Sequence, residues 1–290
     1  MKLLSFSQLF WRSISLIFFS FFLLPVIFVL ASLFTDYNDN WSHLINFVLT
    51  DYILNSIYLI AGVSILSLLF GVGTAWLVTN YDFLGRGWQE WALILPLAVP
   101  PYILAYTFTS LFDSYGSANE IMRYIFSAED EKAFFPNVRN LYGAILVFSS
   151  TLYPYVYLTT RVAFLNQSRT LIESGKLLGL DNKSVFYKLA LPMARPAIIA
   201  GLALVVMETL SDFGAVEHFA VPTFTIGIYR TWFGMYDLNT AMQLSSLLLI
   251  FVAIFLLVER LERNKLAYSY AGSTFKPINK IKLTGWKNYL

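Results

Sequence analysis

The sequence contains no cysteine and only two histidines, His43 and His218. Without cysteine, disulfides, thiol nucleophiles and thiolate-bound metals are excluded. The two histidines stand far apart, and no zinc-ligand spacing surrounds either one. The sequence also lacks the GxxxxGK[ST] pattern of a phosphate-binding loop, so we do not expect the chain to bind ATP in that way. We therefore predict no catalytic residues, no metal and no cofactor, and no enzymatic activity of this chain.

Charge is scarce as well. Only 13% of the 290 residues are charged, 57% are hydrophobic, and the mean hydropathy is +0.61. A soluble domain of this length would carry about a quarter charged residues. The uncharged residues form long runs, which predicts an all-α, polytopic membrane protein. The net charge of +2 at pH 7 gives no indication of a nucleic-acid partner.

Six runs are long enough to cross a bilayer, which needs about 20 apolar residues. They cover residues 13–34, 52–81, 91–112, 140–160, 197–216 and 238–258. Three prolines interrupt the third run and predict kinks there. The first run has 22 residues, longer than the apolar part of a signal peptide (about 7–15), so we expect an uncleaved helix. These runs predict a transmembrane domain over residues 1–265, followed by a basic tail or linker over 266–290.

The basic residues indicate the orientation. If the N-terminus is cytoplasmic and the spans alternate, 16 of the 20 Lys and Arg residues lie on the cytoplasmic side. Positive charge marks that side of a membrane protein. We therefore predict a multi-pass membrane protein with both termini in the cytoplasm.

The predicted cytoplasmic loop over residues 161–196 has the pattern of a helical hairpin. Thr170 and Glu173 have the spacing of a capping box at a helix start. Gly179 suits a left-handed helix end, and Asp181 can cap a second short helix. Pro192 is expected to end that second helix.

Two interpretations fit this loop. It could be an amphipathic hairpin with its apolar face on lipid. Alternatively, it could be a coupling helix that presents Phe186 to a groove of a separate ATPase.

The order Glu173, Gly179, Leu191 and Pro192 favours the second interpretation, because it resembles the EAA loop of ABC importer permeases. In that family Glu-Ala-Ala is followed by Gly and then by Leu-Pro; here Ser and Gly replace the two alanines. The resemblance implies the type I importer fold, a location in a bacterial inner membrane, and a loop that contacts the ATPase. The residues implied in that contact are Glu173, Gly179, Asp181, Phe186, Leu191 and Pro192. The implied partners are a cytoplasmic ABC ATPase dimer, a periplasmic solute-binding protein, a second transmembrane half and membrane lipid.

Residues 207–219 and 221–235 resemble the region after this loop in ferric-iron ABC permeases. This resemblance implies ferric iron as the solute, with thiamine, sulfate or spermidine permeases as alternatives. Ferric permeases commonly carry two six-helix halves in one chain. The sequence therefore fits a truncated chain, one half of a split permease, or a subunit that forms homodimers.

Glu208 and Asp212 lie one helical turn apart in the fifth predicted span and are expected to share a face. Intramembrane carboxylates normally face a protein interior or a watery path, so both residues are candidates for a translocation pathway. The alternative is a span that ends early and leaves both acids at the outer interface. The aromatic segment 219–236 that follows fits either a re-entrant gate or an interfacial belt.

Two other classes of function are alternatives for a chain of this composition. An ion-coupled secondary transporter would use the same two acids as ion sites, but the sequence shows no clear internal repeat of the kind common in that class. An intramembrane enzyme would need a Ser/His pair or a metal motif, and the sequence has neither.

Overall fold

The computed structural model describes residues 6–127, 134–167, 173, 175, 177–265 and 281–282. Within these residues the structure is dominated by helices. A two-residue parallel pairing joins β1 (Tyr81–Asp82) to β2 (Ile281–Lys282). The predicted all-α membrane fold is confirmed.

Five stretches of the described chain are long and apolar enough to cross a membrane: Trp11–Phe34, Asp39–Asn80, Leu141–Leu165, Asn182–Ser211 and Leu238–Leu261. They overlap the five long helices α1 (Phe6–Ala31), α3 (Leu49–Asn80), α7 (Leu141–Leu165), α10 (Leu191–Ser211) and α13 (Leu238–Lys265). These stretches correspond to five of the six predicted spans.

The third predicted span is not one continuous helix. The chain forms α4 (Arg86–Ala92), a 3-10 turn (Leu95–Ala98), α5 (Pro101–Phe112) and α6 (Ser117–Phe126). Its two halves are bent by 96° at the break, so a sixth span exists only if the bent pair counts as one. The cause is the group of prolines at 96, 100 and 101, which cannot donate backbone hydrogen bonds. Val99 and Pro100, which precede two of them, are extended, with ψ of 113° and 139°.

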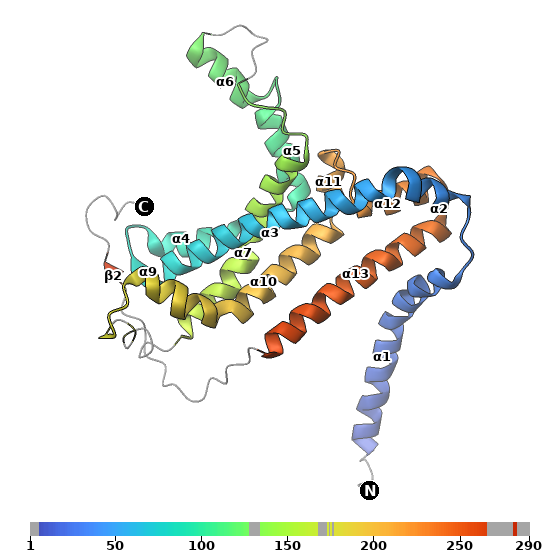
Figure 1. Ribbon diagram of the computed structural model, residues 1–290, viewed down its shortest axis with the longest axis horizontal. Helices are drawn as coiled ribbons and strands as arrows, with labels where there is room; N and C mark the ends of the chain where they lie inside the picture. The colour runs from blue at the N-terminus through green and yellow to red at the C-terminus, as the bar shows by residue number, and fades with distance from the viewer. Residues whose placement is uncertain are drawn as a thin grey trace.

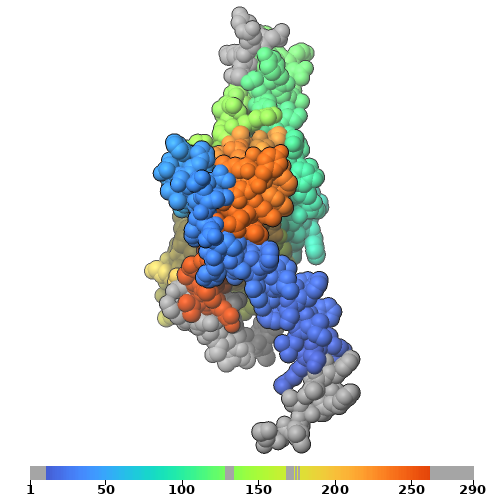
Figure 2. All heavy atoms as spheres, turned by 90° about the vertical axis from the view of Figure 1, so that its right-hand side faces the viewer, coloured from blue at the N-terminus to red at the C-terminus, as the bar shows by residue number. Residues whose placement is uncertain are grey.

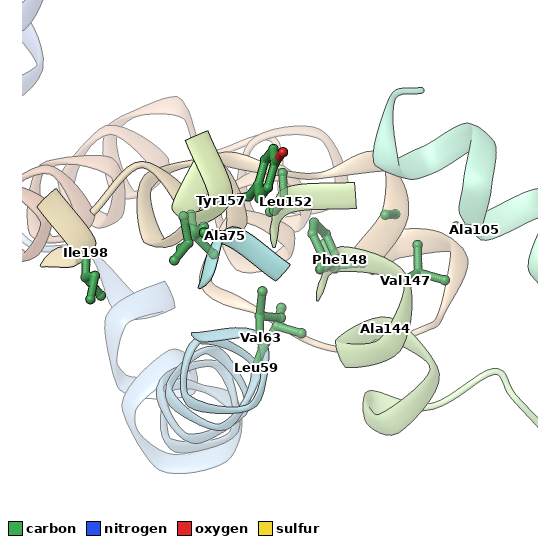
Figure 3. Close-up of a cluster of buried hydrophobic side chains, with 14 of the residues drawn as sticks. Leu59, Val63, Ala75, Ala105, Ala144, Val147, Phe148, Leu152, Tyr157 and Ile198 are labelled. Atoms are coloured by element: carbon green, nitrogen blue, oxygen red, sulfur yellow. The ribbon is translucent and has the colours of Figure 1, made fainter. Parts of the chain in front are cut away.

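Figure 1 shows α3, α7, α10 and α13 as the body of the molecule, with α1 and the α5–α6 arm standing away from it. The core lies where α3 and α7 run along each other and α10 packs on both. The side chains there come from α3 (Leu59, Val63, Ala75), α7 (Val147, Phe148, Leu152, Tyr157) and α10 (Ile198) (Figure 3). This core holds the two ends of the body at fixed positions.

The two ends differ in construction. At the loop end lie α4, β1, α9 (Asn182–Val185) and a π-helical segment (Phe186–Ala190). The opposite end contains the short elements α2 (Asp39–His43), α11 (Gly214–His218) and α12 (Phe224–Tyr229), with π-helical segments at Leu44–Val48 and Arg230–Gly234. Figure 2 views the opposite end, where the chain around α2 and the start of α3 lies beside α12 and α13.

Candidate coupling and translocation site

The turn of the loop has the predicted geometry. Gly179 adopts φ +88°, and no heavy atom lies within 4 Å of the position that a Cβ would occupy. The backbone N–H of Leu180 donates to the carbonyl of Gly175 at 3.0 Å, which closes the end of the first arm. Glycine is therefore required here by the backbone and not by crowding.

The second arm begins as predicted. The Asp181 carboxylate accepts a hydrogen bond from the backbone N–H of Ser184 at 3.0 Å and caps α9. Hydrogen bonds from the side chain and the backbone of Ser184 hold the pKa of Asp181 below its usual value. Thr170, the other half of the predicted capping box, lies outside the described residues. Its partner Glu173 is helical and exposed.

The replacement of alanine by Gly175 has a structural explanation. Gly175 is buried, and a Cβ added there would lie 2.7 Å from Cδ1 of Leu189. Glycine therefore lets the first arm of the loop close tightly on the second. An alanine would require the end of the Leu189 side chain to move.

The expectation that Pro192 ends the second helix is wrong. The stretch Asn182–Ser211 passes from α9 through the π-helical segment Phe186–Ala190 into α10. Pro192 lies in the first turn of α10, where a missing N–H is tolerated, and the wider π turn before it relieves the crowding that proline causes. The loop and the fifth span are therefore one helical rod.

Phe186 is half-buried. Its ring packs 4.8 Å from that of Trp76 on α3, and Trp76 in turn packs 5.3 Å from Phe164 on α7. Leu191 likewise packs against the core. The π turn shifts the helical register, so spacing alone could not indicate which face these residues occupy.

Other apolar side chains are exposed on the loop instead. We call Leu177, Leu178 and Tyr187 the docking ridge; they are 88%, 85% and 65% exposed. Two of the three directly precede the Gly179 turn, and the third follows Phe186. The adjacent Leu-Leu pair is the signal in the sequence for this ridge.

A charged cluster braces the same end. Glu90 of α4 forms ion pairs with Arg161 of α7 and, at 3.4 Å, with Arg86. Arg86 also donates to the carbonyl of Val78 at 2.7 Å, and the Tyr157 hydroxyl donates to the carbonyl of Glu90 at 3.1 Å. The cluster ties α3, α4 and α7 together. The sequence did not indicate it because Glu90 and Arg161 are distant in the chain.

Glu208 lies on the exposed side of α10 and lines a groove of about 390 Å³. The other residues of this groove come from α10, α12 and α13: Met207, Leu210, Ser211, Ile228, Ser245, Leu248, Leu249 and Val252. Among these described lining residues, Glu208 alone carries a charge. Elsewhere in the described chain, no group of three or more His, Asp or Glu residues could hold a metal ion.

Asp212 does not share a helical face with Glu208. Helix α10 ends at Ser211, and Asp212 has an extended ψ of 138°. Its carboxylate accepts hydrogen bonds from the N–H groups of Ala215 at 2.8 Å and Val216 at 3.3 Å. The carboxylate thus satisfies the first N–H groups of α11, which ends the span earlier than predicted.

Segment 219–236 is folded into short helices. Phe219 and Ile226 are buried, whereas Trp232 and Tyr236 are exposed. The His218 ring lies 2.7 Å from the Thr109 hydroxyl and joins α11 to α5. The segment therefore has both a packed side and an aromatic exposed side.

These features define a multi-pass membrane bundle whose structured loop continues into one of its spans. The family of binding-protein-dependent transport system inner membrane components matches residues 67–264, and the chain belongs to this family. The resemblance to type I ABC importer permeases is thereby confirmed.

Curated relatives include permeases of different systems. The chain is 25% identical over 224 residues to the Fe(3+)-transport system permease protein FbpB 2 of Haemophilus influenzae, covering 77% of this chain and 40% of the relative. It is 31% identical over 157 residues to the sulfate transport system permease protein CysT of Salmonella typhimurium, covering 54% of each. It is 28% identical over 153 residues to the molybdenum transport system permease protein ModB of H. influenzae, covering 53% of this chain and 64% of the relative. The chain thus spans about half the length of these relatives.

Solved structures share the fold. A chain of a bacterial ABC transporter involved in the import of the acidic polysaccharide alginate matches with a TM-score of 0.69 and 15% identity, covering 89% of this chain and 96% of that one. The same kind of transporter in complex with an alginate-bound periplasmic protein matches with a TM-score of 0.59 and 18% identity, covering 90% and 93%.

Proposed function

We propose that this chain is a transmembrane subunit, or one half of such a subunit, of an ABC importer that moves a small solute inward. The observation that carries the proposal is the family match over residues 67–264 together with a loop that is continuous with α10. ATP hydrolysis belongs to a separate ATPase dimer. A periplasmic solute-binding protein delivers the solute, and the loop end faces the cytoplasm.

The docking ridge is the surface that we assign to the ATPase. Leu177, Leu178 and Tyr187 expose apolar area on the two arms of the hairpin, and Gly179 sets the turn between the arms. An apolar helical tip of this kind fits a groove in a partner protein. Glu173 and Asp181 lie beside the ridge on the same loop. The proposal therefore moves the main apolar contact from Phe186 to the ridge.

Glu208 is assigned to the translocation pathway. Placing a carboxylate in hydrocarbon costs a few kcal/mol on insertion scales. Because Glu208 is exposed on α10, we expect another protein surface, and not lipid, to cover it. We assign the groove around it to the seam with a second transmembrane half, supplied by another chain or by a second copy. Asp212 then stabilises the outer end of the pathway through its cap on α11.

The charge of this groove favours a cationic solute. A carboxylate attracts a ferric ion and repels an oxyanion such as sulfate or molybdate. Ferric iron is therefore the first candidate solute, in line with the similarity to FbpB 2. The similarity to CysT and ModB supports the second candidate, an oxyanion.

The test is reconstitution in proteoliposomes with an ABC ATPase and a solute-binding protein from the same organism. We expect ATP-dependent uptake of ferric iron, without competition from sulfate or molybdate. Uptake driven by a proton or sodium gradient without the ATPase would refute the ABC assignment. Uptake of sulfate or molybdate would refute the cation assignment alone.

A ridge variant tests the docking surface. Leu178→Glu should abolish co-purification with the ATPase, because it places a charge on the apolar contact. Leu84→Glu is the matched control: this leucine is also exposed at the loop end, but it lies outside the ridge. Equal loss in both variants, or loss in neither, would contradict the assignment of the ridge.

A further inference from the structure

The geometry of the loop end points to a positioning residue outside the ATPase contact. We infer that Gln167 fixes the helical rod Asn182–Ser211 against α7, so that a push on the docking ridge moves α10 without bending the rod. This inference rests on the proposed function, because it assigns Gln167 a part in coupling. Neither the EAA-type pattern nor the loop motif includes this residue.

Gln167 is buried and bonded to the rod. Only 5% of it is exposed, and its Nε2 donates a hydrogen bond to the carbonyl oxygen of Ala190 at 2.7 Å. Ala190 is fully buried and is the last residue of the π-helical segment. Gln167 itself follows directly on the end of α7, where its backbone N–H donates to the carbonyl of Phe164 at 3.3 Å. The amide side chain thus joins the end of α7 to one defined point of the rod.

The rod is irregular at that point. The π turn over Phe186–Ala190 replaces the regular hydrogen-bond pattern, and Pro192 contributes no N–H just after it. A helix with both features next to each other bends more easily there than elsewhere. A side-chain bond to Ala190 therefore acts where the rod would otherwise flex.

Aromatic packing acts at the same place. Phe186, the first residue of the π turn, packs on Trp76 of α3, and Trp76 packs on Phe164, three residues before Gln167. We call Gln167, Trp76, Phe164 and Phe186 the junction clamp. Packing resists sideways displacement of the π turn, whereas the directional hydrogen bond from Gln167 fixes its position along α7. The two constraints are therefore different in kind.

The clamp explains how the loop could act on Glu208. From Ala190 to Glu208 the rod runs 18 residues, or about 27 Å at 1.5 Å per residue. If the junction is fixed, a displacement of the ridge is passed on along α10 towards Glu208. If the junction flexes, the same displacement is lost in bending at residues 186–190, and ATP hydrolysis proceeds without solute movement.

Distance measurements between spin labels test the clamp directly. Because the native chain has no cysteine, cysteines introduced at Val162 on α7 and Lys183 on α9, both exposed, can be labelled specifically. In lipid nanodiscs without any partner, the pair should give one narrow distance distribution. Gln167→Met keeps the volume and removes the donor, so it should widen the distribution at least twofold.

Two further variants separate the hydrogen bond from general damage. The Gln167→Glu variant should give a broad distance distribution at pH 7.5 and a narrow one at pH 5. Burial beside a carbonyl favours the protonated carboxyl, which can donate a hydrogen bond to that carbonyl. Gln243→Met is the matched control: Gln243 is fully buried and donates to the carbonyl of Ser32 at 3.1 Å, at the opposite end. This control should leave the distribution narrow.

Several results would overturn the inference: a narrow distribution in Gln167→Met, equal widening in Gln243→Met, or no narrowing of Gln167→Glu at pH 5. In proteoliposomes with the ATPase, Gln167→Met should lower the solute moved per ATP hydrolysed about tenfold while co-purification with the ATPase persists. If the wild-type chain does not bind the ATPase, the proposed function fails. If the wild type couples and the variant couples equally well, only the role of Gln167 fails.

Discussion

The two ends of the bundle reverse the chain with different residues. At the loop end, the left-handed positions are the glycines Gly85 (φ +82°) and Gly179 (φ +88°). At the opposite end, Ala220 (φ +54°) and Tyr236 (φ +55°) adopt such angles although they carry a Cβ. A left-handed conformation costs a residue with a Cβ about 1–2 kcal/mol. The described residues of the loop end therefore avoid this cost, whereas the opposite end holds backbone strain.

The two ends also differ in the continuity of their helices. The loop end passes into α10 as one rod, while at the opposite end α10 stops at Ser211 and the chain continues through the short helices α11 and α12. Strained positions tend to cluster where a structure changes conformation. The difference leads us to expect that the loop end transmits a displacement and that the opposite end rearranges in response.

The largest expected effect concerns the sides of the membrane. A cysteine at Lys183, at the loop end, should react with an impermeant maleimide only after the cytoplasmic side is opened. A cysteine at Tyr115, which is exposed beyond α5, should react in intact spheroplasts. The opposite pattern would reverse the assignment of the two ends.

Gly179→Val should have the next largest effect. A β-branched residue at φ +88° strains the turn, so we expect transport and ATPase co-purification to fall more than tenfold while membrane insertion persists. Gly179→Asn is the control, because asparagine tolerates left-handed geometry, and it should keep most of the activity. Normal transport and normal co-purification with the ATPase in the valine variant would show that the turn is not part of the docking surface.

Glu208→Gln tests the groove between the two ends. We expect ferric-iron uptake to fall about tenfold, because the pathway loses its charge while the side chain keeps its size. Co-purification with the ATPase should be unchanged, which separates this variant from those of the loop end. A cysteine at 208 should also cross-link to a second transmembrane chain; labelling only by a lipid-confined reagent would refute the seam.

Ala220→Gly tests the strain at the opposite end. Ala220 occupies the left-handed position of a helix end in which Ala220 N–H donates to Glu217 and Val221 N–H to Val216, both at 3.0 Å. Glycine is the usual residue at this position, so the variant should raise stability by about 1 kcal/mol. Gly179→Ala should lower it by a similar amount. Thermal unfolding in detergent measures both changes in stability. Changes of the same sign in the two variants would contradict the contrast in strain between the two ends.

The smallest effect is a pH dependence at Asp237. Burial raises its pKa, but hydrogen bonds from Asn38, Asn40 and Thr240 outweigh this and hold the pKa well below its usual value. The charged carboxylate therefore stabilises the folded state fully above the unfolded-state pKa of about 3.9. This stabilisation is lost as the pH falls below that value. The melting temperature should therefore drop below pH 4 in the wild type and less so in Asp237→Asn. Identical pH profiles would contradict this.

Local rules predicted the loop turn better than the rod that follows it. Gly179 and Asp181 have the expected conformations, because a left-handed turn and a helix cap depend on near neighbours in sequence. Pro192 does not end the helix, and Phe186 packs on Trp76, because the π turn changes the helical register. Trp76 lies on another helix, so the order of residues near Phe186 does not encode this contact.

Features that span longer stretches of the chain were also predicted only in part. The positions of five spans were predicted from their uncharged length, and the prolines of the third indicated a kink but not a bend of 96°. The Glu90–Arg161 pair and the bond from Gln167 to Ala190 join distant parts of the chain. No single-sequence pattern brings such partners together, so they appear only in the folded structure.

The break in the third span also bears on how backbone can be left irregular within a bilayer. Hydrocarbon offers no partner for a free N–H group, so irregular backbone there is normally costly. Between residues 99 and 101, the N–H of Val99 donates to the carbonyl of Pro96 at 3.1 Å, and Pro100 and Pro101 have no N–H at all. A corner built from prolines therefore turns the chain without stranding a donor in lipid, which a corner built from glycines could not do.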